Sequence, residues 1–132
     1  MLRRHILHFA IAGTLGFVID AGLVQLLTAV GRMDPYLARV LSVAVAVLAT
    51  FSYNRLVTFR DRRGSGGVTG DLGRYLLGNA AGLSVNYGAY AAAVAVSAHA
   101  RAWPVLAVAL GSLAGMGVNF LAARHFVWAR TP

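Results

Sequence analysis

Long apolar runs alternate with short polar segments along the whole chain. Four runs have about the ~20 residues that an α-helix needs to cross ~30 Å of hydrocarbon, namely 6–30, 37–57, 75–98 and 102–123. Backbone groups within hydrocarbon must be paired inside their own segment, so each run is expected to be a helix. The pattern predicts an all-α membrane protein, with four transmembrane helices forming a single transmembrane domain over residues 1–132.

A polar, glycine-rich segment separates the second run from the third. It is predicted to be a flexible cytoplasmic linker over residues 61–74. Its glycines lack the preceding strand and the Gly-Lys-Ser/Thr ending of a phosphate-binding loop. The linker therefore predicts no nucleotide site. The first run is too long for the apolar region of a signal peptide, so we expect it to be retained.

The arginines predict the orientation of the spans. Three of them, Arg32, Arg39 and Arg101, fall on one side of the membrane. The other nine fall on the opposite side, namely Arg3, Arg4, Arg55, Arg60, Arg62, Arg63, Arg74, Arg124 and Arg130. Because cytoplasmic loops carry the excess of positive charge, both termini and the linker are predicted to be cytoplasmic.

Composition narrows the classes of function. The chain is 58% hydrophobic and 12% charged, against about 25% charged residues in soluble domains. It has no Glu, Lys or Cys, and its only carboxylates are Asp20, Asp34, Asp61 and Asp71. No acid–base pair or nucleophile constellation can be assembled, so we expect neither an enzyme nor a cofactor. The net charge of +8 comes from arginines at the edges of apolar runs, which predicts contact with membrane lipids rather than nucleic acid.

The two halves of the chain repeat one another. The first helices match at an offset of 66 residues, and the second helices at an offset of 69. Aligned pairs are Gly16 with Gly82, Asp20 with Asn86, Arg39 with Val108, Ser42 with Gly111, Ala46 with Gly115, Thr50 with Asn119 and Arg55 with Arg124. The prediction is two tandem helical hairpins, 6–60 and 75–128, each entering the membrane from the same side as a parallel repeat.

The motifs of this repeat resemble the GtrA-like family of small four-span membrane proteins. They are Gly16-x-x-x-Asp20, Pro35-x-x-Ala38-x-x-x-Ser42, Asn54-Arg55-x-x-Thr58-Phe59 and Asn119-Phe120-x-x-x-Arg124-x-x-x-Trp128. The first half departs from the family pattern at Thr50-Phe51, where Asn-Phe is common, and at Leu56-Val57, where a basic–aromatic pair is common.

The resemblance implies translocation, or flipping, of a polyprenyl-phosphate-linked sugar across the bacterial cytoplasmic membrane for surface polysaccharide synthesis. One alternative is a non-transporting anchor or scaffold for a membrane glycosyltransferase. Another is a small proton-coupled exporter, although such proteins rely on a first-helix Glu with aromatic neighbours, and this chain has only Asp20. The sequence does not decide the sugar, the polyprenol length or the energy source.

Asp20 lies near the middle of the first span, where an unpaired charge is expensive. Arg39 is its predicted partner, because the second half replaces both residues, by Asn86 and Val108. Two interpretations remain open. Either the pair is structural, or Asp20, Asn86, Asn119 and Arg39 form a polar seam that accepts sugar hydroxyls or protons. A protonated Asp20 in lipid is a third alternative.

Arg55 and Arg124 occupy equivalent cytoplasmic ends of the second and fourth spans. A guanidinium fork matches the geometry of phosphate, so both are predicted to bind the lipid phosphate. The alternative is ordinary anchoring at the headgroups.

Two other features of the sequence carry weaker predictions. Small residues spaced four apart, such as Gly78-x-x-x-Gly82 and Gly111-x-x-x-Gly115, favour close helix packing, with a homodimer face as the alternative. His5, His8 and His125 have no Cys or carboxylate nearby in sequence, so no metal site is expected.

Overall fold

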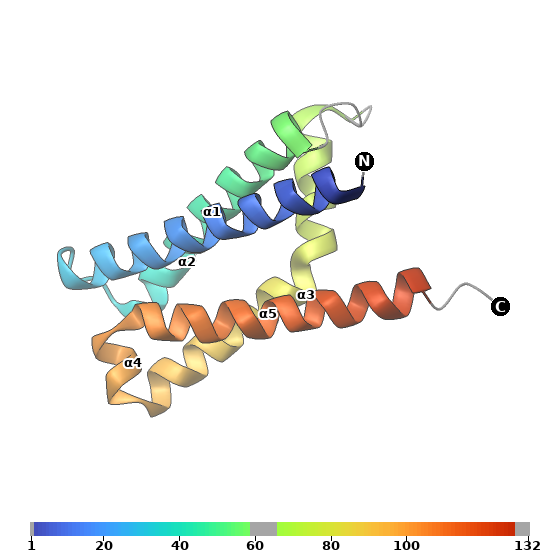
Figure 1. Cartoon of the computed structure of the whole chain (residues 1–132). Helices are drawn as coiled ribbons and strands as arrows, with labels where there is room; N and C mark the ends of the chain where they lie inside the picture. The colour runs from blue at the N-terminus through green and yellow to red at the C-terminus, as the bar shows by residue number, and fades with distance from the viewer. Residues whose placement is uncertain (1, 59–65, 129–132) are drawn as a thin grey trace. The chain divides into compact units, whose positions relative to one another are not determined.

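The computed structural model describes the backbone of residues 2–58 and 66–128, and the side chains of 7–8, 10–58 and 66–119. In these residues every regular element is helical (Figure 1). The elements are α1 (Leu2–Ala29), α2 (Pro35–Tyr53), the π-helix η1 (Asn54–Thr58), α3 (Gly67–Val96), α4 (Ala98–Ala102) and α5 (Pro104–Trp128). They form two compact units, Met1–Leu76 and Leu77–Pro132, and the boundary falls within α3.

A tight turn joins α1 to α2 in the first unit. Its backbone includes Arg32 at a φ of 49°, the left-handed region that few non-glycine residues adopt. Asp34 then caps α2, because its Oδ2 accepts hydrogen bonds from the backbone N–H groups of Tyr36 and Leu37, at 3.1 Å each. Pro35 occupies the first helical position, where its fixed φ suits the helix. The two helices therefore run antiparallel as a hairpin.

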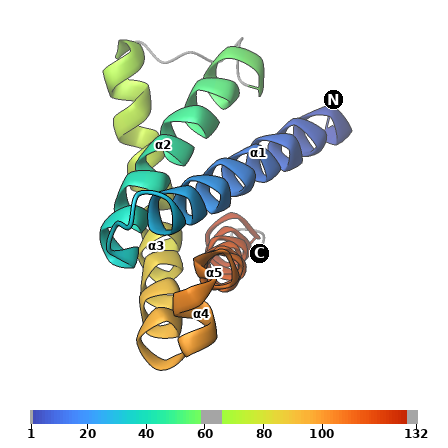
Figure 2. The same ribbon diagram turned by 90° about the vertical axis from the view of Figure 1, so that its left-hand side faces the viewer.

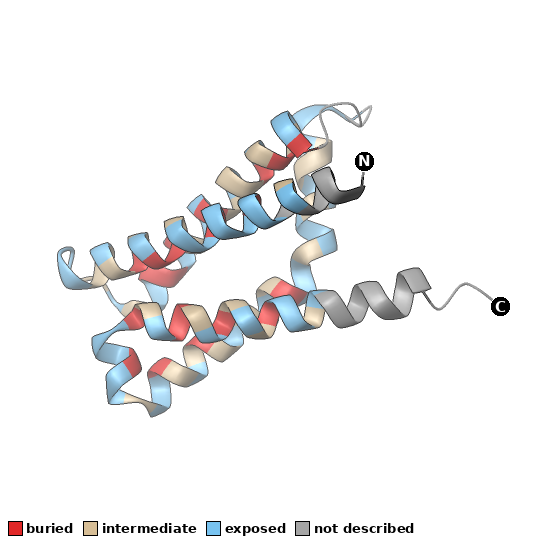
Figure 3. Cartoon of the chain, viewed as in Figure 1, coloured by how far each residue is buried: buried red, intermediate tan, exposed pale blue. Residues whose placement is uncertain are grey.

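Small side chains line the interface between α1 and α2. On α1 the buried positions recur every four residues, at Ala12, Gly16, Asp20 and Val24, and on α2 they include Ala38, Ser42 and Ala46 (Figure 3). A spacing of four places these residues on one face of each helix. Large apolar side chains point away from the protein instead, among them Val18, Leu26 and Leu48. Such an apolar exterior is typical of a protein surrounded by lipid.

The cytoplasmic end predicted for the second span is wound differently from the rest of α2. Its last turn is the π-helix η1, whose residues Asn54 and Thr58 are buried and joined by a hydrogen bond from Thr58 Oγ1 to Asn54 Oδ1, at 3.0 Å. π-Helical turns are rare and occur frequently at functional sites. This turn carries Arg55, one of the two predicted phosphate ligands.

The later part of the polar segment, from Gly67, is helical, which its composition does not predict. Helix α3 begins at Gly67, so residues 67–74 of the expected flexible linker form its first two turns. The physical reason is a set of contacts that composition does not reveal. Tyr75 packs its ring on Phe51 and shares a hydrogen bond with the Thr50 hydroxyl, at 3.1 Å, and these contacts fix the start of α3 against α2.

The second unit holds the remainder of α3 together with α4 and α5. Ser97 follows α3 and caps the short helix α4 by accepting a hydrogen bond from the Ala100 N–H. Arg101 donates to the carbonyl oxygens of Val94 and Ala95, which lack partners within the last turn of α3. Figure 2 shows the ribbons of α3, α4 and α5. Pro104 then begins α5.

Two of the four predicted spans are clear among the described residues. Ala10–Ala29 and Pro35–Thr58 are both long and apolar enough to cross a membrane, and Pro104–Asn119 is a shorter apolar helix. Fewer than a third of the residues in either long span are buried inside the protein, unlike the core helix of a soluble domain. These findings support a helical membrane protein, while four spans in two tandem repeats remain a prediction.

Candidate functional site

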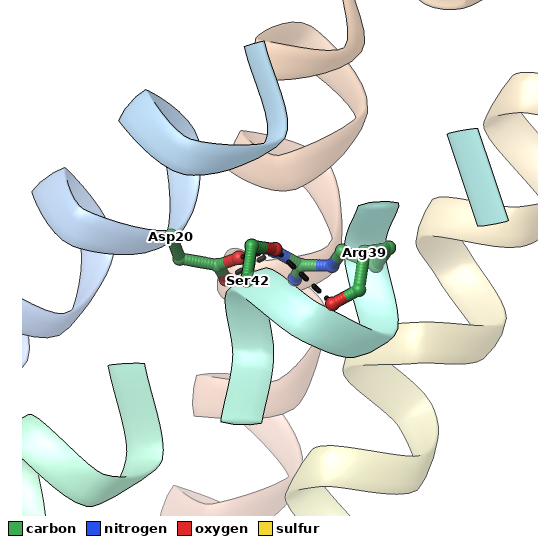
Figure 4. Close-up of polar contacts among 3 residues, drawn as sticks. All are labelled: Asp20, Arg39 and Ser42. Atoms are coloured by element: carbon green, nitrogen blue, oxygen red, sulfur yellow. Dashed lines mark hydrogen bonds and ion pairs between the residues drawn. The ribbon is translucent and has the colours of Figure 1, made fainter. Parts of the chain in front are cut away.

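Asp20 and Arg39 form an ion pair between the two helices of the first unit. An Arg39 terminal nitrogen, Nη1, donates to Oδ2 of Asp20. The other carboxylate oxygen, Oδ1, accepts a hydrogen bond from the Ser42 hydroxyl at 2.6 Å, and Figure 4 shows the three side chains meeting between α1 and α2. The pairing of Asp20 with Arg39 was predicted from the sequence and is confirmed, whereas the contact of Ser42 with Asp20 was not predicted.

Burial of this cluster is almost complete. Arg39 and Ser42 are 0% exposed and Asp20 is 6% exposed. Asp20 lies ten residues beyond Ala10, or ~15 Å along the span at ~1.5 Å per residue. A lone charge at that depth would be unstable, but here the carboxylate has a counter-charge and a hydroxyl donor. In this conformation both oxygens of the Asp20 carboxylate are hydrogen-bonded to side chains of α2.

The second unit places neutral residues at the aligned positions. Asn86 packs on Gly111, where an added Cβ would lie 2.5 Å from the Asn86 carbonyl oxygen. Val108, which aligns with Arg39, is also 0% exposed. A buried ion pair in the first unit thus corresponds to an amide and an apolar side chain in the second.

A second pair of aligned positions is in contact in both units. A Cβ added to Gly16 would lie 2.6 Å from Thr50 Cγ2, and a Cβ added to Gly82 would overlap the Asn119 side-chain amide. Thr50 and Asn119 are equivalent in the repeat, as are Gly16 and Gly82. Asn119 therefore packs against a glycine of α3, and its side chain belongs to a helix interface as well as to the predicted polar seam.

Arg55 is held by an ion pair that the sequence analysis did not identify. Its Nε donates to Oδ2 of Asp71, at 3.1 Å, and Nη2 of Arg74 donates to Oδ1 of the same carboxylate, at 2.9 Å. The side chain of Arg55 is 20% exposed, that of Asp71 14% and that of Arg74 62%. Arg124 lies in α5, beyond the described side chains.

The signals for this cluster are present in the sequence but ambiguous. Asp71 and Arg74 are three residues apart, a spacing that brings side chains together only if the segment is helical. Five glycines in the neighbourhood favoured an irregular linker instead. The interaction of Arg55 with Asp71 spans 16 residues and depends on how α3 packs, which the spacing does not specify.

The histidines considered for metal binding have other surroundings where the structure describes them. Nδ1 of His8 is hydrogen-bonded to the Tyr53 hydroxyl, at 3.0 Å, which ties the start of α1 to the end of α2. Among the described residues, no three His or Asp side chains gather into a metal-binding group. His5 and His125 lie outside the described side chains.

Comparison with protein families gives a match that covers nearly the whole chain. The family described as GtrA/DPMS, transmembrane domain, matches residues 8–128. The matched region includes most of both units and every residue of the candidate site. No curated protein and no solved structure matches the chain.

Proposed function

The chain belongs to the GtrA/DPMS transmembrane domain family, and from this membership we propose that it flips a polyprenyl-phosphate-linked sugar across a bacterial cytoplasmic membrane. Family membership identifies a membrane protein concerned with glycans or lipid-linked sugars, in a family that is generally non-catalytic. Within that class we propose one activity, translocation of the sugar lipid for surface polysaccharide synthesis. Its partners are the sugar lipid and the surrounding membrane lipids.

The proposed topology is four spans in two parallel hairpins, with both termini in the cytoplasm. The distribution of arginines supports this orientation. Equivalent contacts within each unit support the repeat, because Gly16 packs on Thr50 as Gly82 packs on Asn119. A pseudo-twofold arrangement would then place equivalent arginines, Arg55 and Arg124, at one entrance.

The observation that carries the phosphate site is the setting of Arg55. It stands on a π-helical turn at the end of a membrane-spanning helix and remains partly exposed. Within the described residues only its Nε is engaged, so Nη1 and Nη2 can form a bidentate contact with phosphate. Arg124 is proposed as the second phosphate ligand on the grounds of its equivalence in the repeat.

The polar seam is proposed to carry the sugar. Asp20, Asn86, Asn119 and Arg39 supply the carboxylate, amide and guanidinium groups suited to hydroxyls. Asp20 and Arg39 are paired with each other and buried, so contact with a sugar requires α1 and α2 to separate. Transport in this proposal therefore includes a conformational step that exposes the pair.

The burial of this pair favours a second candidate function, a scaffold that holds a membrane glycosyltransferase without transporting anything. A pair that never opens is consistent with a static helix bundle. In that case the predicted cytoplasmic segment, residues 58–74, matters more than the buried polar groups. A homodimer is a third arrangement, through faces rich in small residues.

Reconstitution distinguishes the two functions. Purified protein in sealed vesicles with a polyprenyl-phosphate sugar is expected to accelerate exposure of inner-leaflet lipid to an external probe. The variant with both Arg55→Ala and Arg124→Ala is expected to lose the acceleration, while Arg32→Asn serves as a control that removes charge elsewhere. A folded protein with no effect beyond empty vesicles would contradict the flippase proposal and favour the scaffold.

A further inference from the structure

Three charged side chains meet at the cytoplasmic end predicted for the first hairpin. Arg55 comes from η1, and Asp71 and Arg74 come from the first two turns of α3. The two arginines bind opposite oxygens of one carboxylate, so the cluster has two positive charges and one negative charge. We infer that Arg74 is a further ligand for the phosphate bound by Arg55, in addition to the proposed Arg124, and that Asp71 positions both guanidinium groups. This inference rests on the proposed phosphate site of Arg55.

Hydrogen-bonding capacity supports a binding role for the two arginines. Among the described residues Asp71 engages one nitrogen of each, Nε of Arg55 and Nη2 of Arg74. Each guanidinium has five N–H donors, so most donors of both groups remain available to a ligand. A carboxylate that grips Arg55 by Nε leaves the two terminal nitrogens as a fork, the arrangement that phosphate oxygens match.

Exposure divides the roles of the two arginines. Arg55 is mostly buried at the end of a span, while Arg74 is 62% exposed. The adjacent Tyr75 contacts Phe51 and Thr50 of α2, which anchors this end of α3. Tyrosines typically lie at the headgroup level of a membrane. Arg74, next to Tyr75 in sequence, is thus expected near that level, where the phosphate of a lipid headgroup lies.

The ligand class is a phosphate or pyrophosphate ester. Two guanidinium groups with one intervening carboxylate leave a net positive charge, which attracts an anion with several oxygens. The source is either the headgroup of an isoprenyl lipid or free phosphate. The apolar exterior of the neighbouring α2, with Leu56 57% exposed on η1, offers a surface for an isoprenyl chain.

Binding of geranylgeranyl phosphate to the full-length protein in nanodiscs of zwitterionic lipid tests the inference. Geranylgeraniol is the matched ligand without phosphate. Arg74→Ala is expected to weaken phosphate binding about fivefold, the effect of one largely exposed charge-assisted contact, without changing geranylgeraniol binding. The phosphate affinity of Arg74→Lys should lie between those of the unmodified protein and of Arg74→Ala. Arg32→Asn is the matched control, because it removes one charge at an exposed turn whose φ of 49° tolerates Asn.

Asp71→Asn tests whether Asp71 positions the two arginines, because positioning and charge predict opposite changes in phosphate affinity. Removing a negative charge should by Coulomb attraction alone strengthen phosphate binding. Positioning predicts the opposite, about threefold weaker binding, because the two guanidinium groups lose the carboxylate that orients them. The Arg55 Nε–H signal in side-chain 15N NMR is expected to shift in this variant before any ligand is added. Stronger binding in Asp71→Asn would overturn the positioning role.

The outcomes separate this inference from the proposed function. If Arg55→Ala weakens phosphate binding while Arg74→Ala behaves like Arg32→Asn, the role of Arg74 is wrong and the Arg55 site stands. If the unmodified protein does not prefer geranylgeranyl phosphate to geranylgeraniol, both are wrong. Competition by inorganic phosphate at similar concentration would support the paired arginines as a site for free phosphate. Lack of competition would support them as a lipid headgroup site.

Discussion

Asp20 and Arg39 are joined across the α1–α2 interface in an ion pair that is almost wholly excluded from solvent, with Ser42 on the second carboxylate oxygen. Such a pair resists the loss of either member more than the loss of both, because a single substitution leaves one charge buried alone. The second unit provides a natural version without charge, Asn86 with Val108. Substituting the residues of the second unit into the first can therefore test whether the pair is structural or functional.

Replacing both members by their counterparts should separate structure from function. Asp20→Asn and Arg39→Val are each expected to destabilise the protein by ~3 to 5 kcal/mol, as in other broken buried pairs. The double variant is expected to recover most of that loss, because Asn with Val is what the second unit carries. The free energy of unfolding of the two single variants and the double variant is measured in mixed micelles.

Transport by the double variant then decides the role of the charges. A stable double variant that still flips lipid would make the pair structural. A stable double variant without flipping would assign the charges to the polar seam. Failure of the double variant to recover stability would contradict the equivalence of the two hairpins at this position.

The approach of Gly16 to Thr50 predicts a steric effect with a specific rescue. Gly16→Ala places a Cβ 2.6 Å from Thr50 Cγ2, which is expected to cost ~1 to 3 kcal/mol. Thr50→Ser removes that methyl group and retains the hydroxyl bonded to Tyr75, so the double variant should regain stability. Gly13→Ala is the matched control, because nothing lies within 4 Å of its Cβ. Equal losses at positions 13 and 16 would contradict close packing there.

The cap of α2 predicts a smaller and purely local effect. Asp34→Ala removes the acceptor for the Tyr36 and Leu37 N–H groups and should lower stability by ~0.5 to 2 kcal/mol. Asp34→Ser should restore most of it, since serine is also a good cap. Thermal unfolding in detergent provides the measurement. A loss in Asp34→Ser as large as that in Asp34→Ala would indicate that the charge, not the cap, is responsible.

The proposed topology can be tested by labelling, because the chain has no cysteine. A single cysteine at exposed Thr69 is expected to react with an impermeant maleimide only after the cytoplasmic side is opened. Cysteines at Arg32 and His99, also exposed, should react from the outside. Reaction of the Arg32 and His99 positions from opposite sides would contradict two hairpins of the same orientation.

Residues of the candidate site differ in how far the sequence revealed them. The Asp20–Arg39 pair was predictable, because each member is costly alone in a span and the repeat loses both together. The cluster of Arg55, Asp71 and Arg74 was not, because it requires the polar segment to become helical and pack on α2. Glycine content argued against that helix, and the contacts of Tyr75 with Phe51 and Thr50 outweighed it.

The sequence by itself determined the apolar helices, the membrane environment and the family, because these depend on free energies summed over consecutive residues. Tertiary structure decided which oxygen of Asp20 the Ser42 hydroxyl binds, that Arg55 lies on a π-helical turn and that Asp71 is its ion-pair partner. Those contacts depend on the rotation and register of one helix against another. Side-chain packing sets that geometry, since the observed alignment brings Gly16 to Thr50 and Asp20 to Arg39 and Ser42.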